Sequence, residues 1–191
     1  MNQPAVFLDR DGTMIEDVGY LDRLERLKFF PYTIDAVRLL NRAGYAVVVV
    51  TSQNGVAQGV LTEEFLTEAH AHMSRVCEAA GGKIAGYYYC PHSTHAAVER
   101  YRTDCECRKP KPGMILAAAR EHGLDLSRSF VVGDRWRDVE MGLAAGTSAL
   151  LVETGYGRTE AARRPAHIPV VPVTGTLIEA VSVILRRESR P

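Results

Sequence analysis

The fold of this 191-residue chain is decided by the stretch Phe7-Leu8-Asp9-Arg10-Asp11-Gly12-Thr13. Two carboxylates, Asp9 and Asp11, stand two positions apart directly after the short apolar run 4–8, which predicts a buried strand. Gly12 lets the chain turn sharply where that strand ends, and open α/β sheets bind ligands at the carboxyl ends of their strands. We therefore expect both carboxylates to project into a crevice.

This pair of carboxylates is suited to phosphoryl transfer. One carboxylate can attack phosphorus as a covalent nucleophile, while the second protonates the leaving oxygen and later activates water. Two carboxylates near a phosphate need a hard cation, and we expect Mg²⁺ on Asp9, on the backbone carbonyl of Asp11 and on at least one further carboxylate. A lone Asp-x-Asp is also common in turns, so the motif gains its weight from partners elsewhere in the chain.

Three partners follow along the chain in the order that such a site requires. The β-branched run 45–50 predicts a strand buried on both faces and ends in Thr51, whose hydroxyl can bind a phosphoryl oxygen. Lys109 lies in a proline-bounded loop before a helical pattern and can balance an anionic transition state. The run 129–132 is closed by Gly133 and Asp134, so the Asp134 carboxylate can complete the metal site.

Each partner taken alone also has a simpler explanation. Thr51 could be a strand-end hydroxyl, Lys109 a solvated surface lysine and Asp138 a helix-cap carboxylate. These explanations are individually common and jointly improbable.

Together, the four elements in this order resemble the haloacid dehalogenase superfamily, and the resemblance extends over nearly the whole chain. The resemblance implies these roles: Asp9 as nucleophile, Asp11 as general acid and base, Thr51 and Lys109 as phosphoryl stabilisers, Asp134 as metal ligand, and Asp138 as a residue that orients its neighbours.

A second constellation lies between residues 90 and 107, where Cys90 and His92 are followed by Cys105 and Cys107. Three thiolates and one imidazole suit Zn²⁺, and the connecting loop is too polar to build a core of its own. Because protein groups would fill all four tetrahedral positions, we expect a structural zinc that holds the start of the loop containing Lys109.

Other interpretations of the cysteines and histidines stay open. The cysteines of the loop could be reduced and unrelated, or one pair could form a disulfide, and His95 is a substitute ligand. Cys77 fits a small apolar position on a helix. His70 and His72 lie two apart on the same predicted helix and therefore on different faces, so we expect both to be solvated.

With this loop, the chain resembles more closely the branch that removes the 7-phosphate of heptose 1,7-bisphosphates in lipopolysaccharide and S-layer sugar synthesis. Histidinol phosphatases share the zinc loop and remain an alternative. The stretches 17–20 and 88–92 and the longer loop to Cys105 resemble the heptose branch. The substrate contacts expected on this basis are Asp17, Val18, Gly19, Tyr20, Ser52, Gln53, Asn54, Arg108 and Arg135. Residues 17–20 could equally form a simple turn, and Gln53 and Asn54 could satisfy loop backbone.

Two departures from the family pattern concern the substrate contacts. The family usually has Thr-Asn-Gln-Ser-Gly-Ile-Ala-Arg-Gly where this chain has residues 51–59, so Ser52 and Gln58 replace a familiar amide and a familiar arginine. Arg135 stands where a lysine is common, which keeps the charge but changes a point donor into a planar fork. The reaction type is therefore better determined than the substrate.

The periodicity of the chain predicts one α/β domain over residues 1–191, with a doubly wound, Rossmann-like parallel sheet. Expected strands lie near 4–9, 45–50, 84–89, 129–133 and 148–152, and expected helices near 33–43, 62–80, 113–122, 136–145 and 174–187. Residues 153–172 predict a loop with one short strand. No insertion is long enough for a large cap domain, so the site should be open, with specificity supplied by surface loops.

Charge and composition limit the possible partners. Twenty-three basic and twenty-three acidic residues cancel, which argues against nucleic acid and thus against polynucleotide 3′-phosphatases, although these share a similar aspartate motif. No signal-peptide pattern or long apolar segment is present, so we expect a cytoplasmic protein without a membrane partner, and no apolar stripe compels a dimer, so we expect a monomer. The alternative of a different class is a catalytically silent, zinc-stabilised binding module.

Overall fold

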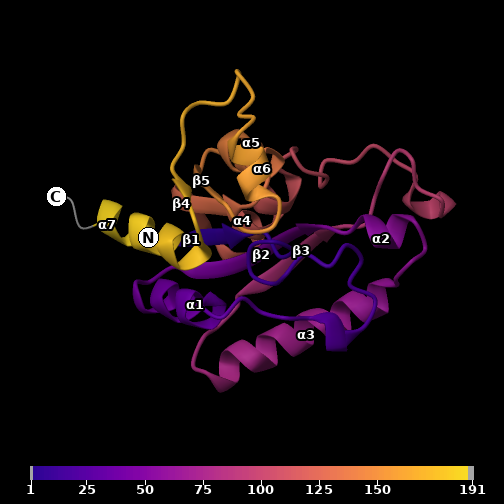
Figure 1. The fold of residues 1–191 in the computed structure, drawn as a ribbon, viewed down its shortest axis with the longest axis horizontal. Coiled ribbons are helices and arrows are strands. Elements are labelled where there is room, and N and C mark those ends of the chain that lie inside the picture. Colours follow the sequence, from indigo (N-terminus) through magenta and orange to yellow (C-terminus); the bar gives the residue numbers. More distant parts are fainter. Residues whose placement is uncertain (1, 189–191) are drawn as a thin grey trace.

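The computed structural model describes residues 2–188 and contains one six-stranded parallel sheet in the order β3-β2-β1-β4-β5-β6 (Figure 1). The strands are β1 (Gln3–Leu8), β2 (Ala46–Ser52), β3 (Gly86–Cys90), β4 (Leu124–Gly133), β5 (Ser148–Val152) and β6 (Val173–Thr174). The chain builds outward from β1 through β2 to β3, and then continues on the other side of β1 with β4. Ligand sites form where the strand order reverses in this way, at the carboxyl ends of the strands. Here that place is beside β1 and β4.

Helices cover both faces of the sheet, as expected for a doubly wound fold (Figure 1). They are α1 (Thr33–Arg42), α2 (Asn54–Ala57), α3 (Glu63–Ala79), α4 (Gly113–His122), α5 (Trp136–Ala144), α6 (Gly157–Ala161) and α7 (Leu177–Glu188), with short 3₁₀ helices η1 (Leu24–Arg26) and η2 (Glu99–Tyr101). In β1, Val6 and Leu8 pack into one core with α1, α3 and α7. Ala5 and Phe7 point to the opposite core, with α4 and α5. This period of two explains why β1 is apolar on both faces.

The expected strands and helices are all present, and one differs clearly in length. β4 begins at Leu124, five residues before the expected start, and its register with β1 shifts between Pro4 and Val6. The Ser129 hydroxyl fills this interruption, because it accepts from the Ala5 N–H (2.8 Å) and donates to the Asp125 carbonyl (2.5 Å). The periodicity of the sequence breaks at this irregularity, which conceals the first half of the strand.

The segment after β5 differs from the expected loop. It contains α6, and the short strand β6 lies just beyond the stretch in which a strand was expected. The expected helix at 174–187 begins later, at Leu177, because Thr174 extends the sheet beside Val152. The Glu179 carboxylate accepts hydrogen bonds from the Gly175 N–H (2.9 Å) and the Thr176 hydroxyl (3.1 Å), which stabilises the start of α7.

The described part of the chain leaves the carboxyl edge of the sheet without a large inserted cap. Only η1 and α1 separate β1 from β2, and only α2 and α3 separate β2 from β3. Within residues 2–188, no helix is long and apolar enough to cross a membrane.

Candidate active site

The motif residues meet at the carboxyl ends of β1, β2 and β4. Asp9 continues β1, and its N–H donates to the Val132 carbonyl of β4 at 2.9 Å. Asp134 follows β4 directly, and Asp138 lies one turn into α5. Each of these three carboxylates offers an oxygen within 4.8 Å of the others, and all three side chains are buried.

Lys109 lies inside this cluster, although its sequence position is compatible with a surface lysine. Its Nζ contacts Asp9 Oδ1 and Asp138 Oδ1, both at 2.7 Å, and only 6% of the residue is exposed. The ammonium therefore cancels part of the carboxylate charge. Asp138 also accepts the Arg135 N–H (3.0 Å), so it fixes both Lys109 and the beginning of α5.

Burial shifts the pKa values of the charged groups in this cluster. It raises the pKa of Asp9 to about 6, against the lowering effect of Lys109, and raises the pKa of Asp134 to about 8 with a further contribution from Asp9. Burial alone would lower the pKa of Lys109, but Asp138 and Asp9 raise it above its ordinary value. One lysine facing three carboxylates leaves a surplus of negative charge that a bound cation can stabilise.

The residues present fit a divalent cation. Asp134 Oδ1 is buried without a hydrogen-bond partner, while Oδ2 accepts the Tyr156 N–H at 2.8 Å. Gly12 leaves this carboxylate room, because a Cβ at Gly12 would lie 2.3 Å from Asp134 Oδ2 and the φ of Gly12 is +83°. Carboxylate oxygens are the ligands that Mg²⁺ prefers in proteins.

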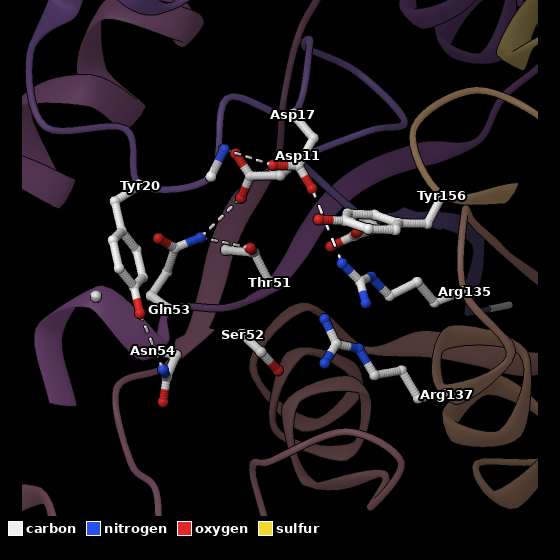
Figure 2. A pocket seen from close by; sticks show the side chains of 13 residues that line it. Asp11, Asp17, Tyr20, Thr51, Ser52, Gln53, Asn54, Arg135, Arg137 and Tyr156 are labelled. Carbon is white, nitrogen blue, oxygen red and sulfur yellow. Dashed lines mark hydrogen bonds and ion pairs between the residues drawn. The ribbon is translucent and has the colours of Figure 1, made fainter. Parts of the chain in front are cut away.

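Asp11 faces the cavity and is fixed by two donors. Both of its oxygens accept from the Arg10 guanidinium at 2.9–3.2 Å. Gln53 Nε2 donates to Asp11 Oδ2 at 3.0 Å (Figure 2). The same amide nitrogen donates to Thr51 Oγ1 at 2.7 Å. Arg10 is 1% exposed and is a residue that sequence reasoning missed. The sequence feature that could have identified Arg10 is a single basic residue between two aspartates, directly after a predicted buried strand.

The expectation that His70 is solvated is wrong. His70 is buried, stacks on Tyr87 with 4.4 Å between ring centroids, and has its Nε2 3.5 Å from Arg10 Nη1. Burial lowers its pKa to about 3, so its ring is neutral. The burial of His70 could have been predicted from the helical spacing of Leu66, Met73 and Cys77, because His70 lies on the same face of α3 as these apolar residues. His72 lies on another face and is half-buried.

A cavity of about 180 Å³ opens above the carboxylates. Its lining is Asp9, Asp11, Asp17, Gly19, Tyr20, Thr51, Ser52, Gln53, Asn54, Gly55, Arg135, Arg137 and Tyr156 (Figure 2). The structure thus brings most of the expected substrate contacts together with Asp9, Asp11 and Thr51, while Lys109 contacts Asp9 from outside the described lining. Val18 and Arg108 are not among the described residues that line it, and Arg108 Nη1 instead donates to the His92 carbonyl at 2.6 Å.

Two lining residues, Arg137 and Tyr156, were missed by sequence reasoning. Tyr156 belongs to the segment after β5 and reaches the site because β5 lies beside β4. Its ring lies 3.5 Å below the Arg135 guanidinium carbon, and Arg135 also lies 4.0 Å from Asp17 Oδ2. Across the cavity, Asn54 Nδ2 donates to the Tyr20 hydroxyl at 3.3 Å.

The second constellation also assembles in space. Cys90, His92, Cys105 and Cys107 each offer a ligand atom within 4.8 Å of the others. Their separations include 3.5 Å for Cys90 to Cys105, 3.2 Å for Cys105 to Cys107 and 3.4 Å for His92 Nδ1 to Cys107 Sγ. Ligands of a tetrahedral zinc lie about 3.5–3.8 Å apart, whereas disulfide sulfurs lie about 2 Å apart. The four residues therefore suit zinc, and their thiols are free.

The neighbouring residues tie this loop to the rest of the fold. The hydroxyls of Tyr89 and Tyr101 donate to the two oxygens of Glu63 at 2.5 and 2.6 Å, and these bonds lower the pKa of Glu63. His95 is not part of the four-residue group and meets Gln58 through its backbone carbonyl. Cys77 is fully buried on α3, as expected for a small apolar position.

Comparison with known proteins gives consistent matches. A family model described as HAD-hydrolase-like matches residues 106–180. The D-glycero-beta-D-manno-heptose-1,7-bisphosphate 7-phosphatase of Photorhabdus laumondii is 40% identical over 166 residues, which cover 86% of this chain and 88% of that protein. The phosphatase of the same name from Escherichia coli K12 is 40% identical over 164 residues, covering 85% and 86%.

A solved structure shows the same fold. The D,D-heptose 1,7-bisphosphate phosphatase from B. bronchiseptica, complexed with magnesium and phosphate, is 30% identical and has a TM-score of 0.85. The match covers 96% of this chain and 99% of that one.

Proposed function

Because the chain belongs to the HAD-like family of heptose-bisphosphate phosphatases, we propose that it removes the 7-phosphate of D-glycero-β-D-manno-heptose 1,7-bisphosphate. The observation that carries this proposal is the buried group of Asp9, Lys109, Asp134 and Asp138 below a cavity rich in hydrogen-bonding side chains. Such a group is costly to bury and is characteristic of a site that binds a charged ligand. A merely structural module has no need of it.

The reaction has two steps in which the residues of this chain exchange protons and the phosphoryl group. An Asp9 oxygen attacks phosphorus while the bond to the sugar oxygen breaks, and Asp11 gives its proton to that leaving oxygen. Asp11, now ionised, then takes a proton from a water molecule that attacks the aspartyl phosphate, which releases inorganic phosphate and restores Asp9. Thr51 Oγ1 and Lys109 Nζ would donate to the phosphoryl oxygens.

Two metal ions complete the proposal. Asp9, Asp134 and the backbone carbonyl of Asp11 would hold Mg²⁺, which supplies positive charge to the transferred phosphoryl group. Zn²⁺ would be held by the four residues of the Cys/His group and would fix the loop that carries Lys109.

The test compares phosphate release in the presence of Mg²⁺ from both anomers of the heptose bisphosphate and from histidinol phosphate. We expect the β-bisphosphate to have the largest kcat/KM. Asp9→Asn should abolish release while the chain stays folded and keeps its zinc. Asp35→Asn, which changes an exposed aspartate of α1, is the matched control. Turnover retained in Asp9→Asn, or a preference for histidinol phosphate, would refute the proposal.

A further inference from the structure

Two buried polar side chains, Arg10 and His70, lie beside the site and have no part in the two chemical steps. Arg10 is 1% exposed and His70 is 6% exposed. Neither belongs to the cavity lining found within residues 2–188. Burying a guanidinium and an imidazole costs free energy unless each has a partner, so their contacts should explain why they are buried together.

The guanidinium of Arg10 is held at both of its ends. Nε and Nη2 donate to the two oxygens of Asp11 at 2.9–3.2 Å, which leaves Nη1 for another partner. Nη1 lies 3.5 Å from Nε2 of His70, on α3. Because the guanidinium is planar and rigid, a contact at Nη1 restricts the rotation of the whole group. The direction in which Arg10 presents its donors to Asp11 therefore depends on His70.

The imidazole of His70 is suited to accept from Arg10 and is itself fixed. A guanidinium can only donate, so Nε2 is the acceptor and the ring is neutral, with its proton on Nδ1. The ring stacks on Tyr87 of β3, with 4.4 Å between centroids and 11° between planes. The Tyr87 hydroxyl in turn lies 3.1 Å from Ser74 Oγ, one turn further along α3. Thus α3 and β3 together set the position of the acceptor.

Building on the proposed function, we infer that His70 is a positioning residue for the general acid and base, and that it acts through Arg10. One Asp11 oxygen can pass its proton to the leaving sugar oxygen while the other oxygen remains bound to the guanidinium. Gln53 holds the same carboxylate from the cavity side (Figure 2). Proton transfer requires an aligned donor, so loss of this alignment should lower kcat more than it changes KM.

Two variants separate the acceptor of His70 from its packing. His70→Phe keeps an aromatic ring on Tyr87 and removes the acceptor, whereas His70→Gln loses the ring and restores an acceptor near the position of Nε2. We expect His70→Phe to lower kcat for the heptose bisphosphate about 10-fold with little change in KM, and His70→Gln to lower it less. His72→Phe, on another face of α3, is the control and should behave as the wild type. A larger loss in His70→Gln than in His70→Phe would show that only packing matters and would overturn the inference.

The leaving group gives a readout that a general structural defect would not produce. p-Nitrophenyl phosphate releases a stable phenolate that needs no proton, whereas a sugar oxygen needs the proton of Asp11. With enzyme in excess, the single turnover of each ester follows formation of the aspartyl phosphate. His70→Phe should slow this step about 10-fold for the sugar ester and less than about 2-fold for the nitrophenyl ester. Equal slowing of the two esters would overturn the inference.

A combined variant tests whether His70 acts through Arg10. Arg10→Lys keeps the charge and removes the fork, so adding His70→Phe to it should cause little further loss of kcat. An undiminished second loss would contradict the path through the guanidinium. A preference of the wild type for histidinol phosphate would refute the proposed function, but histidinol phosphate is also an alkyl ester. The same comparison with p-nitrophenyl phosphate would then still decide the role of His70.

Discussion

Replacing Lys109 by methionine should destabilise the protein strongly, and the size of the effect should depend on pH. The side chain of Lys109 is 1% exposed, and its Nζ lies 2.7 Å from both Asp9 and Asp138. Methionine has nearly the same length and removes only the charge and its donors. The variant therefore leaves two buried carboxylates, Asp9 and Asp138, without their lysine.

The magnitude follows from the loss of one partner of a buried ion pair. Such a loss costs about 3–5 kcal/mol, because the remaining charge stays buried and unpaired. For a chain of this size, about 2–4 °C of thermal midpoint corresponds to 1 kcal/mol, so we expect the midpoint of Lys109→Met to fall by about 6–20 °C. Hydrolysis should also be lost, since Lys109 would balance the anionic transition state.

The pH dependence has a definite sign. Burial already raises the pKa of Asp9 to about 6 in the presence of Lys109, and without this lysine the pKa rises further. A carboxyl group whose folded pKa exceeds its unfolded value stabilises the fold at low pH and loses this contribution as the pH rises. The difference in free energy of unfolding between wild type and variant should therefore be larger at pH 8 than at pH 5.

The assay is thermal or urea unfolding at pH 5 and pH 8 in buffer without added Mg²⁺, with Lys111→Met as the matched control. Lys111 is half-buried and contacts the exposed carboxylates of Asp104 and Glu106 at 2.8 and 3.2 Å. Its variant should unfold as the wild type does, because exposed ion pairs contribute little. Equal midpoints for the two variants, or a destabilisation by Lys109→Met that is the same at both pH values, would refute the reasoning.

Two further predictions concern the zinc loop and the buried histidine. Cys107→Ser should bind less than one zinc per chain by metal analysis and should unfold at a lower temperature than the wild type. Cys77→Ser, the control, should keep its zinc. A full zinc content in Cys107→Ser would contradict the assigned ligands. His70→Phe keeps the ring stack on Tyr87 but removes a group whose pKa is lowered to about 3 by burial and then by Arg10. Below about pH 6.5 this histidine binds a proton in the unfolded chain but not in the folded protein. The free energy of unfolding of the wild type should therefore fall by about 1 kcal/mol per pH unit between pH 6 and pH 4, in addition to any fall that His70→Phe shows over the same range. Parallel stability curves for the two proteins would rule out this role of His70.

The sequence predicted those residues of the site that directly follow a recognisable strand. The apolar run before Asp9 and the β-branched run before Thr51 identify two buried strands, and strands in a parallel sheet place their carboxyl ends at one edge. The four zinc-loop residues were predicted from their types and their spacing. Lys109 was expected at the site from its charge and its proline-bounded loop, whereas its direct contact with Asp9, 100 residues away, is visible only in the structure.

Several features follow from strand order and packing, which no short stretch of sequence contains. Tyr156 reaches Asp134 because β5 lies beside β4, and Arg10 meets His70 because α3 covers that face of the sheet. Arg137 and Ser52, whose Nε and Oγ are buried without a hydrogen-bond partner, line the same cavity for the same reason. Periodicity determines which face of its own element a residue occupies, whereas the packed sheet determines which other element that face meets. The sequence by itself thus predicted a carboxylate group suited to phosphoryl transfer and a Cys/His group suited to zinc, and only the tertiary structure decided which side chains line the cavity above the carboxylates.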